Sequence, residues 1–271
     1  MYKHIESNHN IMGSYNSISV IIPALNEEEN IENSVENVLE SFRKLQINGE
    51  VVIVNDGSTD NTENIADRCV EKYPNVQSIN HIKPQGVGKA YWDGLKASKG
   101  ECVTWVPADG ENDAFEILRY LPLMNQVDII IPYVYNKETR SWNRRLLSKV
   151  YKAIINLSFG MILNYMNGTV IFRKSILKDV KLKSGGFFFQ TELLIKTIKQ
   201  GYLYAEVPYA LSLRDSGQSK ALSFKSLCKV MFGYIGMFFS VYLYNSKNTD
   251  IHSDSLTWKR KALLSQKASS T

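Results

Sequence analysis

The first part of the chain alternates short apolar runs with longer segments of helical periodicity. Apolar runs that end in a turn residue predict strands, and apolar residues that recur every three or four positions predict helices. The predicted strands are Ile18–Pro23, Glu50–Val54, Val76–His81, Cys102–Val106 and Val127–Pro132. The predicted helices are Glu28–Leu45, a segment ending near Tyr73, Tyr91–Ser98 and Ala114–Met124. This alternation predicts an α/β fold with a mostly parallel sheet flanked by helices.

The second part of the chain is less regular and more basic. A helix is predicted over Thr139–Phe159, where Arg and Lys alternate with Leu, Val and Ile. Strands are predicted at Thr169–Phe172 and Glu206–Leu213, with a helix at Leu193–Lys199 between them. A solvated charged face is the ordinary interpretation of the basic helix, and an anion-binding face is the alternative.

An apolar and aromatic stretch follows at Val230–Tyr244, with lysines on both sides. It is shorter than the ~20 residues that a membrane-spanning helix needs. We therefore expect a helix that lies in a membrane interface, with a shallow hairpin, a core helix or an oligomer contact as alternatives. The chain then divides into a loose leader (1–16), a domain with two halves (17–132 and 133–225), an apolar membrane-interface segment (226–245) and a polar basic tail (246–271).

Composition limits the possible partners. The 271 residues carry a net charge of +5, with Lys and Arg in excess mainly after Lys137. A phosphorylated substrate or an anionic membrane surface fits this charge. A nucleic acid is disfavoured, because no recognition motif or aromatic stacking platform accompanies the basic residues. The three cysteines, Cys69, Cys102 and Cys228, lack metal-type spacing and predict reduced, packed thiols in the cytoplasm.

Candidate chemistry is concentrated where predicted strands end. Asp109 and Glu111 follow the strand Cys102–Val106, which Pro107 ends because proline cannot donate to a ladder. In open α/β sheets ligands bind at the carboxyl ends of the strands, and two hard oxygen ligands suit Mg²⁺ or Mn²⁺ carrying a phosphate. A plain turn that caps the next helix is the alternative.

Two other loops leave the same predicted edge. One contains Asp56, and the other contains Gly86, Gly88 and Lys89 at the start of a helix. Backbone N–H groups at such a helix start suit a phosphate, but a plain turn is the favoured interpretation of this motif by itself. The convergence of three loops on one edge favours the metal interpretation of the acidic turn.

Four motifs, in this order, resemble the family 2 glycosyltransferases of the GT-A fold. They are Val20–Glu27, Val54–Asp60, Gly86–Ala90 with Gly94, and Pro107–Glu111. Further on, Glu206–Pro208 with Arg214, Gly217, Ser219 and Lys220 is similar to the dolichol-phosphate mannosyltransferase-like branch, which acts on polyprenyl phosphates. The resemblance covers roughly residues 17–225. It implies an inverting, metal-dependent transfer of a sugar from a nucleotide-sugar donor to a lipid phosphate, by a protein peripheral to the cytoplasmic face of a membrane.

The resemblance also implies roles for individual residues. Those of the donor site are Pro23, Leu25 and Glu27 at the base and ribose, Asp56 at the base, Gly86 and Lys89 at the phosphates, and Asp109 with Glu111 on Mg²⁺ or Mn²⁺. Departures from the family pattern are Pro107 for a usual Asp, Glu111 for a common Gln, Val87 for a common Lys and Asn164 for a frequent Asp. We therefore expect a metal site of altered shape and a sugar that differs from the mannose or glucose of well-known members.

The acceptor decides the remaining roles. A hydroxyl acceptor needs a general base, for which Glu192 is the candidate. A phosphate acceptor needs no base but needs cations. The candidate cations are Arg144, Arg145, Arg214 and Lys220, of which Arg214 joins Asp109 and Glu192 as a catalytic candidate. The basic helix and the apolar segment favour the lipid phosphate. The alternatives are a saccharide hydroxyl acceptor, a sugar nucleotidyltransferase and an inactive nucleotide- or lipid-binding homologue, and a homo-oligomer is compatible with all of them.

Overall fold

The computed structural model describes residues 17–110, 112–136, 142–166, 168–182, 186, 188–210, 224–243 and 251–269. Glu111, Arg214 and Lys220, to which the sequence assigns roles, lie outside these ranges. The backbone of Arg144 lies in a described helix, but its side chain is outside the description.

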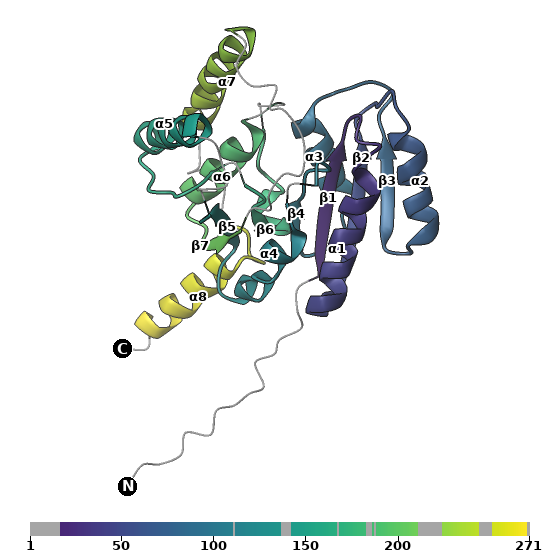
Figure 1. Cartoon of the computed structure of the whole chain (residues 1–271). Coiled ribbons are helices and arrows are strands. Elements are labelled where there is room, and N and C mark those ends of the chain that lie inside the picture. The colour runs from purple at the N-terminus through teal and green to yellow at the C-terminus, as the bar shows by residue number, and fades with distance from the viewer. Residues whose placement is uncertain are drawn as a thin grey trace.

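A single twisted sheet runs through the described part of the chain (Figure 1). Its seven strands follow the order β3-β2-β1-β4-β6-β5-β7. They are β1 (Ile18–Ala24), β2 (Gly49–Asn55), β3 (Val76–Asn80), β4 (Cys102–Trp105), β5 (Ile129–Val134), β6 (Ile171–Arg173) and β7 (Tyr204–Tyr209). Only β6 pairs antiparallel with its described neighbours β4 and β5, so the other strands all run in one direction. The predicted mostly parallel α/β fold is confirmed.

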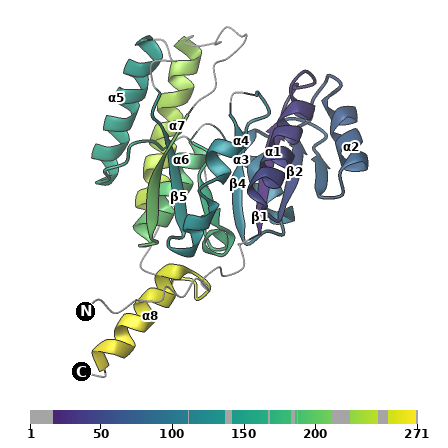
Figure 2. The ribbon, with the colours of Figure 1, turned by 60° about the horizontal axis from the view of Figure 1, so that its bottom comes forward.

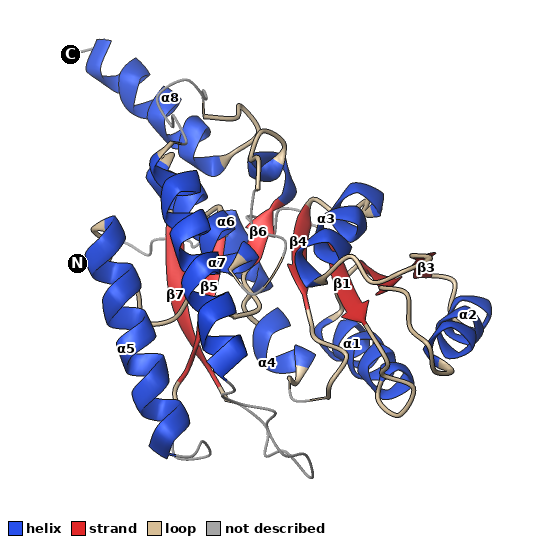
Figure 3. Ribbon diagram, turned by 90° about the horizontal axis from the view of Figure 1, so that it is seen from above, coloured by secondary structure: helices blue, strands red, loops and turns tan. Residues whose placement is uncertain are grey.

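Helices cover both faces of this sheet, as the view from above shows (Figure 3). They are α1 (Ile31–Leu45), α2 (Thr62–Lys72), α3 (Val87–Ala97), α4 (Ala114–Leu118), α5 (Trp142–Phe159), α6 (Phe189–Lys199), α7 (Phe224–Tyr242) and α8 (Leu256–Ser269). Short 3₁₀ helices occupy Leu121–Asn125 and Lys174–Leu177. Apolar side chains of α1, α2 and α4 share one core with the sheet, and those of α3, α5, α6 and α7 share the other.

The two cores explain why the strands are almost entirely apolar. Successive side chains of a strand point to opposite faces, so Val20 and Ile22 contact the α1 side while Ile21 contacts the α3 side. All three are fully buried. Burial of a side chain of this size contributes roughly 2 kcal/mol to stability, and a strand covered on both faces collects this contribution at every position.

The parallel register brings several strand ends to one edge of the sheet. In β1, Ala24 is level with Asn55 of β2, and Ile21 is level with Trp105 of β4. The loops after β1, β2 and β4 therefore leave the same edge, where the carboxyl ends of β5 and β7 also lie. We call this the carboxyl edge. It is the edge at which ligands bind in open α/β sheets.

Two sequence predictions need correction. The predicted helix Ala114–Met124 is broken into α4 and the 3₁₀ helix Leu121–Asn125, because Pro122 has no N–H to continue an α-helix. The predicted hairpin alternative for Val230–Tyr244 is wrong, since α7 is one continuous helix that begins at Phe224. Within the described residues, no helix combines the length and the apolar character needed to cross a bilayer.

The polar tail contains α8, whose start is fixed by a buried carboxylate. Asp128, fully buried at the start of β5, accepts hydrogen bonds from the backbone N–H groups of Leu256 (2.8 Å) and Thr257 (2.9 Å). It also accepts from the Arg173 guanidinium over 3.0 Å. Negative charge at a helix N-terminus is stabilising, so this contact fixes α8 at the edge opposite the carboxyl edge. In Figures 1 and 2 α8 extends from the end of the molecule that lies away from α5 and α7.

Candidate active site

The loops after β1 and β2 are fastened to each other. Asn26, in the left-handed region with a φ of +57°, accepts from the Thr59 N–H over 2.8 Å, and its own N–H donates to Ser58 Oγ over 3.0 Å. The Glu27 N–H donates to Thr62 Oγ1 over 2.9 Å. Next to these bonds Leu25 is exposed and Pro23 is half-buried. The three residues predicted to border the nucleotide therefore lie at the carboxyl edge, with Pro23 near the end of β1 and Leu25 and Glu27 in the loop that follows.

Asp56 connects these loops to the glycine-rich loop. Its backbone N–H donates to Ala24 O over 2.8 Å, and its buried carboxylate accepts from the N–H groups of Gln85 (2.8 Å) and Gly86 (2.7 Å). His81 Nδ1 lies 2.7 Å from Asp56 Oδ1, and since a carboxylate only accepts, the ring nitrogen donates. The sequence assigned Asp56 to the base but gave no sign of these internal contacts.

The glycine-rich loop ends at the first turn of α3. Gly86 has a φ of +95°, a conformation that only glycine adopts freely, and α3 begins at the next residue. The amino end of α3 thus lies beside Asp56 at the carboxyl edge, where helix polarity favours an anion. Lys89, predicted to reach the phosphates, instead pairs with Asp93 one turn further along α3.

The acidic turn follows β4 and is held by α1. Ser34 Oγ donates to Ala108 O over 3.2 Å, and Asn37 of α1 accepts from the Ala114 N–H over 2.8 Å. Asp113 accepts from the Phe115 N–H over 3.0 Å and so caps α4, as the plain-turn alternative requires of this segment. Asp109, in the turn after β4, is partly exposed. No group of three or more metal-ligating side chains occurs among the described residues, which do not include Glu111.

Aromatic rings and a buried ion pair fill the space beyond β4. Phe189, at the start of α6, contacts Trp105 and Tyr91, with ring centroids 5.8 Å and 5.2 Å apart. Three positions further along α6, Glu192 is fully buried and accepts from Lys196 Nζ over 2.5 Å and from Ser240 Oγ of α7 over 2.6 Å. A general base must reach the acceptor, so this burial disagrees with Glu192 as a base. The contacts fit a structural carboxylate that joins α6 to α7.

A basic pocket lies between α5 and the segment 161–166, beside the end of β5. It has a volume of about 70 Å³. Its lining residues are Val134, Arg145, Ser148, Lys149, Lys152, Asn164 and Tyr165. Arg145 was a predicted acceptor contact, whereas Lys149 and Lys152 lie in the basic helix predicted over Thr139–Phe159 and were given no role of their own. Their spacing of four and seven residues from Arg145 places all three on one side of a helix, which is the signal that identifies them.

The helices α5 and α7 lie side by side (Figures 1 and 2). Both expose apolar residues. Phe159 of α5 stacks on Tyr242 and contacts Phe238 of α7, both with centroids 5.8 Å apart. The solvent-exposed apolar residues of these two helices form what we call the α5–α7 apolar surface. Its exposed residues are Trp142, Leu146, Leu147, Val150, Ile154 and Leu157 of α5, and Phe232, Ile235, Phe239 and Tyr242 of α7.

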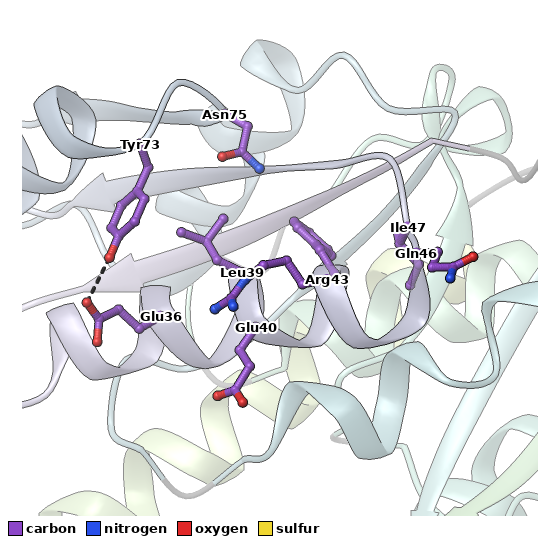
Figure 4. A pocket seen from close by; sticks show the side chains of 9 residues that line it. Glu36, Leu39, Glu40, Arg43, Gln46, Ile47, Tyr73 and Asn75 are labelled. Carbon is purple, nitrogen blue, oxygen red and sulfur yellow. Dashed lines mark hydrogen bonds between the residues drawn. The ribbon is translucent and has the colours of Figure 1, made fainter.

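A larger hollow, of about 670 Å³, lies elsewhere (Figure 4). It is lined by α1 residues such as Glu36 and Leu39, together with Tyr73 and Asn75. Tyr73 closes one end by donating to Glu36 over 2.8 Å. Gln46 and Asn75 precede β2 and β3, so the hollow opens toward the amino ends of the strands. It is separate from the motifs, and the carboxyl edge remains the candidate active site.

Comparisons with known proteins place this site in context. A family model described as Glycosyl transferase family 2 matches residues 19–181. The chain is 30% identical over 214 residues to a dolichol-phosphate mannosyltransferase of Pyrococcus furiosus, covering 75% of this chain and 58% of that protein. It is 27% identical over 224 residues to an undecaprenyl-phosphate 4-deoxy-4-formamido-L-arabinose transferase of Proteus mirabilis, covering 80% of this chain and 66% of that protein. The chain therefore spans about three fifths of the length of these relatives.

Solved structures share the fold. Glucosyl-3-phosphoglycerate synthase from Mycobacterium tuberculosis, in complex with Mg²⁺ and uridine diphosphate, matches with a TM-score of 0.62 at 20% identity over 83% of this chain and 79% of that chain. The same enzyme with Mn²⁺, uridine diphosphate and glucosyl-3-phosphoglycerate matches with a TM-score of 0.59 at 21% identity over 83% of this chain and 80% of that chain. At this identity the likeness establishes the GT-A-like fold alone.

Gly57 offers a test of how tightly the loops after β2 and β3 are packed against each other. Its φ is +72°, and a Cβ there would lie 2.5 Å from the carbonyl carbon of Lys83. Gly57→Ala is expected to lower the free energy of unfolding by about 3 kcal/mol, because a strained backbone and an unyielding backbone contact add. Gly160→Ala is the control, since its φ is +65° with nothing within 4 Å, and should cost about 1 kcal/mol. Urea unfolding measures both, and equal losses would contradict the close contact.

Proposed function

The chain belongs to glycosyltransferase family 2, and we propose that it transfers a sugar from a nucleotide-sugar donor to a polyprenyl phosphate, with a divalent cation and inversion of the anomeric centre. One observation carries the choice of acceptor. The basic pocket lies on α5, and the same helix continues into the α5–α7 apolar surface. A lipid phosphate needs cations for its head group beside an apolar surface for its chain, and this helix provides both.

The donor occupies the carboxyl edge in this proposal. Pro23, Leu25 and Glu27 border the base and ribose, next to Asp56 at the end of β2. The amino end of α3, which follows Gly86, faces the diphosphate. Bond cleavage leaves negative charge on the departing diphosphate, and fixed backbone N–H groups stabilise it without reorganisation. The positive end of the α3 dipole acts in the same direction.

Asp109, with Glu111, is the proposed anchor for the cation. The partly exposed Asp109 carboxylate at the carboxyl edge is a hard oxygen ligand, which suits Mg²⁺ or Mn²⁺. Two protein carboxylates with diphosphate oxygens fit these ions, which commonly retain substrate and water ligands. When bound, the cation neutralises charge that develops on the leaving group.

A phosphate acceptor agrees better with the surroundings of Glu192 than a hydroxyl acceptor does. A phosphate is already an anion and attacks without a general base, and the buried Glu192 is engaged by Lys196 and Ser240. Arg145, Lys149 and Lys152 supply the positive charge. Arg144, the neighbour of Arg145 on α5, and Arg214 and Lys220, which follow β7 in the sequence, stay proposed contacts of the same phosphate. The names of the two curated relatives support this acceptor class.

The α5–α7 apolar surface is the proposed membrane contact, at a cytoplasmic membrane face. It presents large apolar side chains, with Trp142 69% and Leu157 88% exposed, next to the lysines and arginine of α5. Apolar residues beside cations are typical of helices that lie in an anionic membrane interface. The membrane contact would thus bring the lipid head group directly to the basic pocket.

The direct test is transfer itself. The protein is incubated with a panel of nucleotide sugars, Mn²⁺ and undecaprenyl phosphate in detergent, and organic extracts are analysed for a glycosylated lipid by mass spectrometry. A lipid product with one donor supports the proposal. Transfer only to saccharide acceptors would contradict the lipid acceptor, and formation of a sugar nucleotide from a sugar phosphate and a nucleoside triphosphate would contradict the reaction class.

Asp109→Asn should abolish turnover with little effect on folding. The amide binds a divalent cation poorly, so transfer should fall by at least about 100-fold while the unfolding midpoint changes little, because the side chain is partly exposed. The rate is measured over a range of Mn²⁺ concentrations. Asp113→Asn is the control, since Asp113 caps α4 and is not a proposed ligand. Near-normal turnover of Asp109→Asn would disprove the metal role.

Arg145→Ala should weaken binding of the acceptor rather than binding of the donor. Loss of one charge-assisted contact predicts a rise of about tenfold in KM for undecaprenyl phosphate with an unchanged KM for the nucleotide sugar. Arg260→Ala on α8, at the opposite edge of the sheet, is the matched control and should change neither constant. Equal rises in both Michaelis constants for Arg145→Ala would count against a phosphate pocket.

The membrane contact predicts vesicle binding. The double variant Leu157→Asp/Phe239→Asp should bind vesicles containing phosphatidylglycerol at least about tenfold more weakly than the wild type in flotation assays, because two apolar side chains no longer enter the interface. Leu263→Asp/Leu264→Asp on α8 removes exposed apolar residues at the other end of the molecule and serves as the control. Equal losses in both double variants would refute the assignment of the surface.

A further inference from the structure

A buried histidine stands between two carboxylates behind the donor loops. His81 directly follows β3, and its side chain is 7% exposed. Nδ1 lies 2.7 Å from Asp56 Oδ1, and Nε2 lies 3.2 Å from Asp93 Oδ2. The second contact lacks the alignment of a hydrogen bond, so it is an electrostatic contact, whereas the first is a directed bond. The family motifs stated above do not include His81.

The two carboxylates lie on the elements that hold the two ends of the proposed donor. Asp56 follows β2 and accepts the N–H groups of Gln85 and Gly86, which lead into α3. Asp93 lies on α3 itself and pairs with Lys89 and Lys96. Burial raises the pKa of Asp93, but the hydrogen bonds and charges of these lysines outweigh it and hold that pKa below its usual range. His81 therefore joins an acceptor on β2 to a charged group on α3.

We infer that His81 is a positioning residue for the donor nucleotide, which holds the Asp56 carboxylate in the orientation that fixes the glycine-rich loop. The inference rests on the proposed function, because it assumes that a nucleoside diphosphate binds at this edge. His81 does not touch the donor in this proposal. It acts through Asp56, and so through the backbone N–H groups at the amino end of α3.

The packing explains why a small rotation of the Asp56 carboxylate would move the backbone N–H groups that are proposed to face the phosphates. Asp56 Oδ1 is shared by His81 and the Gln85 N–H, while Oδ2 takes the Gly86 N–H. Without the imidazole, one of three bonds to a buried carboxylate is lost, and the carboxylate is free to turn. Gly57 lies so close to the backbone of Lys83 that the two loops have no room to adjust separately. A shift at Asp56 therefore displaces the loop that precedes α3.

Two substitutions of His81 separate positioning from simple packing. In His81→Asn the amide nitrogen occupies the place of Nδ1, so a donor toward Asp56 is kept. In His81→Gln the amide nitrogen occupies the place of Nε2, so the donor toward Asp56 is lost while a polar group of similar size still faces Asp93. Both variants remove the ring, so both should lower the unfolding temperature to a similar extent. The difference between them isolates the bond to Asp56.

The measurement is the Kd of uridine diphosphate and of guanosine diphosphate, each with Mn²⁺, by isothermal titration of the full chain. For the nucleotide that the wild type binds more tightly, we expect His81→Gln to raise the Kd about tenfold and His81→Asn to raise it less than about threefold. His252→Gln is the matched control, because His252 also lies near an aspartate, with Nδ1 3.5 Å from Asp254 Oδ2, but at the opposite edge of the sheet. It should leave the Kd unchanged.

The possible failures are distinguishable. If the wild type binds a nucleotide and the two His81 variants raise its Kd equally, or leave it unchanged, the positioning role is overturned while the proposed function stands. If the wild type binds neither nucleotide with Mn²⁺, the proposed donor site fails and the inference fails with it. A lowered unfolding temperature without a difference in Kd would show that His81 only stabilises the fold.

Discussion

The structure depends on the parallel pairing of β1 with both β2 and β4. This pairing is what brings the ends of three strands to one edge, where their loops meet. The loops themselves carry few apolar residues, so they would not pack against one another without the sheet. Once placed, they are joined by side-chain contacts such as Asn26 to Thr59 and Asp56 to Gly86. A site made of such loops is rigid because its supports are buried strands rather than because its own residues are apolar.

Much of this could be predicted from sequence, because the signals are local. Apolar runs, helix periodicity and turn residues determine the parallel strands and most helix positions, and the four motifs indicate which loops matter. Features that depend on distant partners could not be predicted. The antiparallel β6 is only three residues long, and the Asp128 cap joins residues 128 positions apart. Glu192 is the clearest case, since its sequence position suits a base and only Ser240, 48 residues later, reveals its burial.

The part of the chain proposed to bind the donor is acidic, and the part proposed to bind the acceptor is basic. Residues 1–136 contain 10 Lys and Arg against 20 Asp and Glu, whereas residues 137–271 contain 22 against 7. An acidic half repels an anionic donor unless a cation and backbone N–H groups compensate, which is the physical reason to expect a metal there. A basic half attracts an anionic lipid surface without a cofactor. The net charge of +5 hides this division.

The contact between Glu192, Lys196 and Ser240 connects α7, and with it the α5–α7 apolar surface, to the candidate site. Separating α7 from α6 would leave a buried ion pair without the Ser240 hydroxyl, which bonds both charges. Breaking such buried networks costs roughly 3 kcal/mol or more, so the two helices move together. The same α6 places Phe189 against Trp105 at the end of β4. Through that ring the α5–α7 apolar surface has a fixed position relative to the acidic turn. If this surface contacts a membrane, as proposed, the distance between the membrane and the carboxyl edge is therefore set by the core and not by a flexible linker.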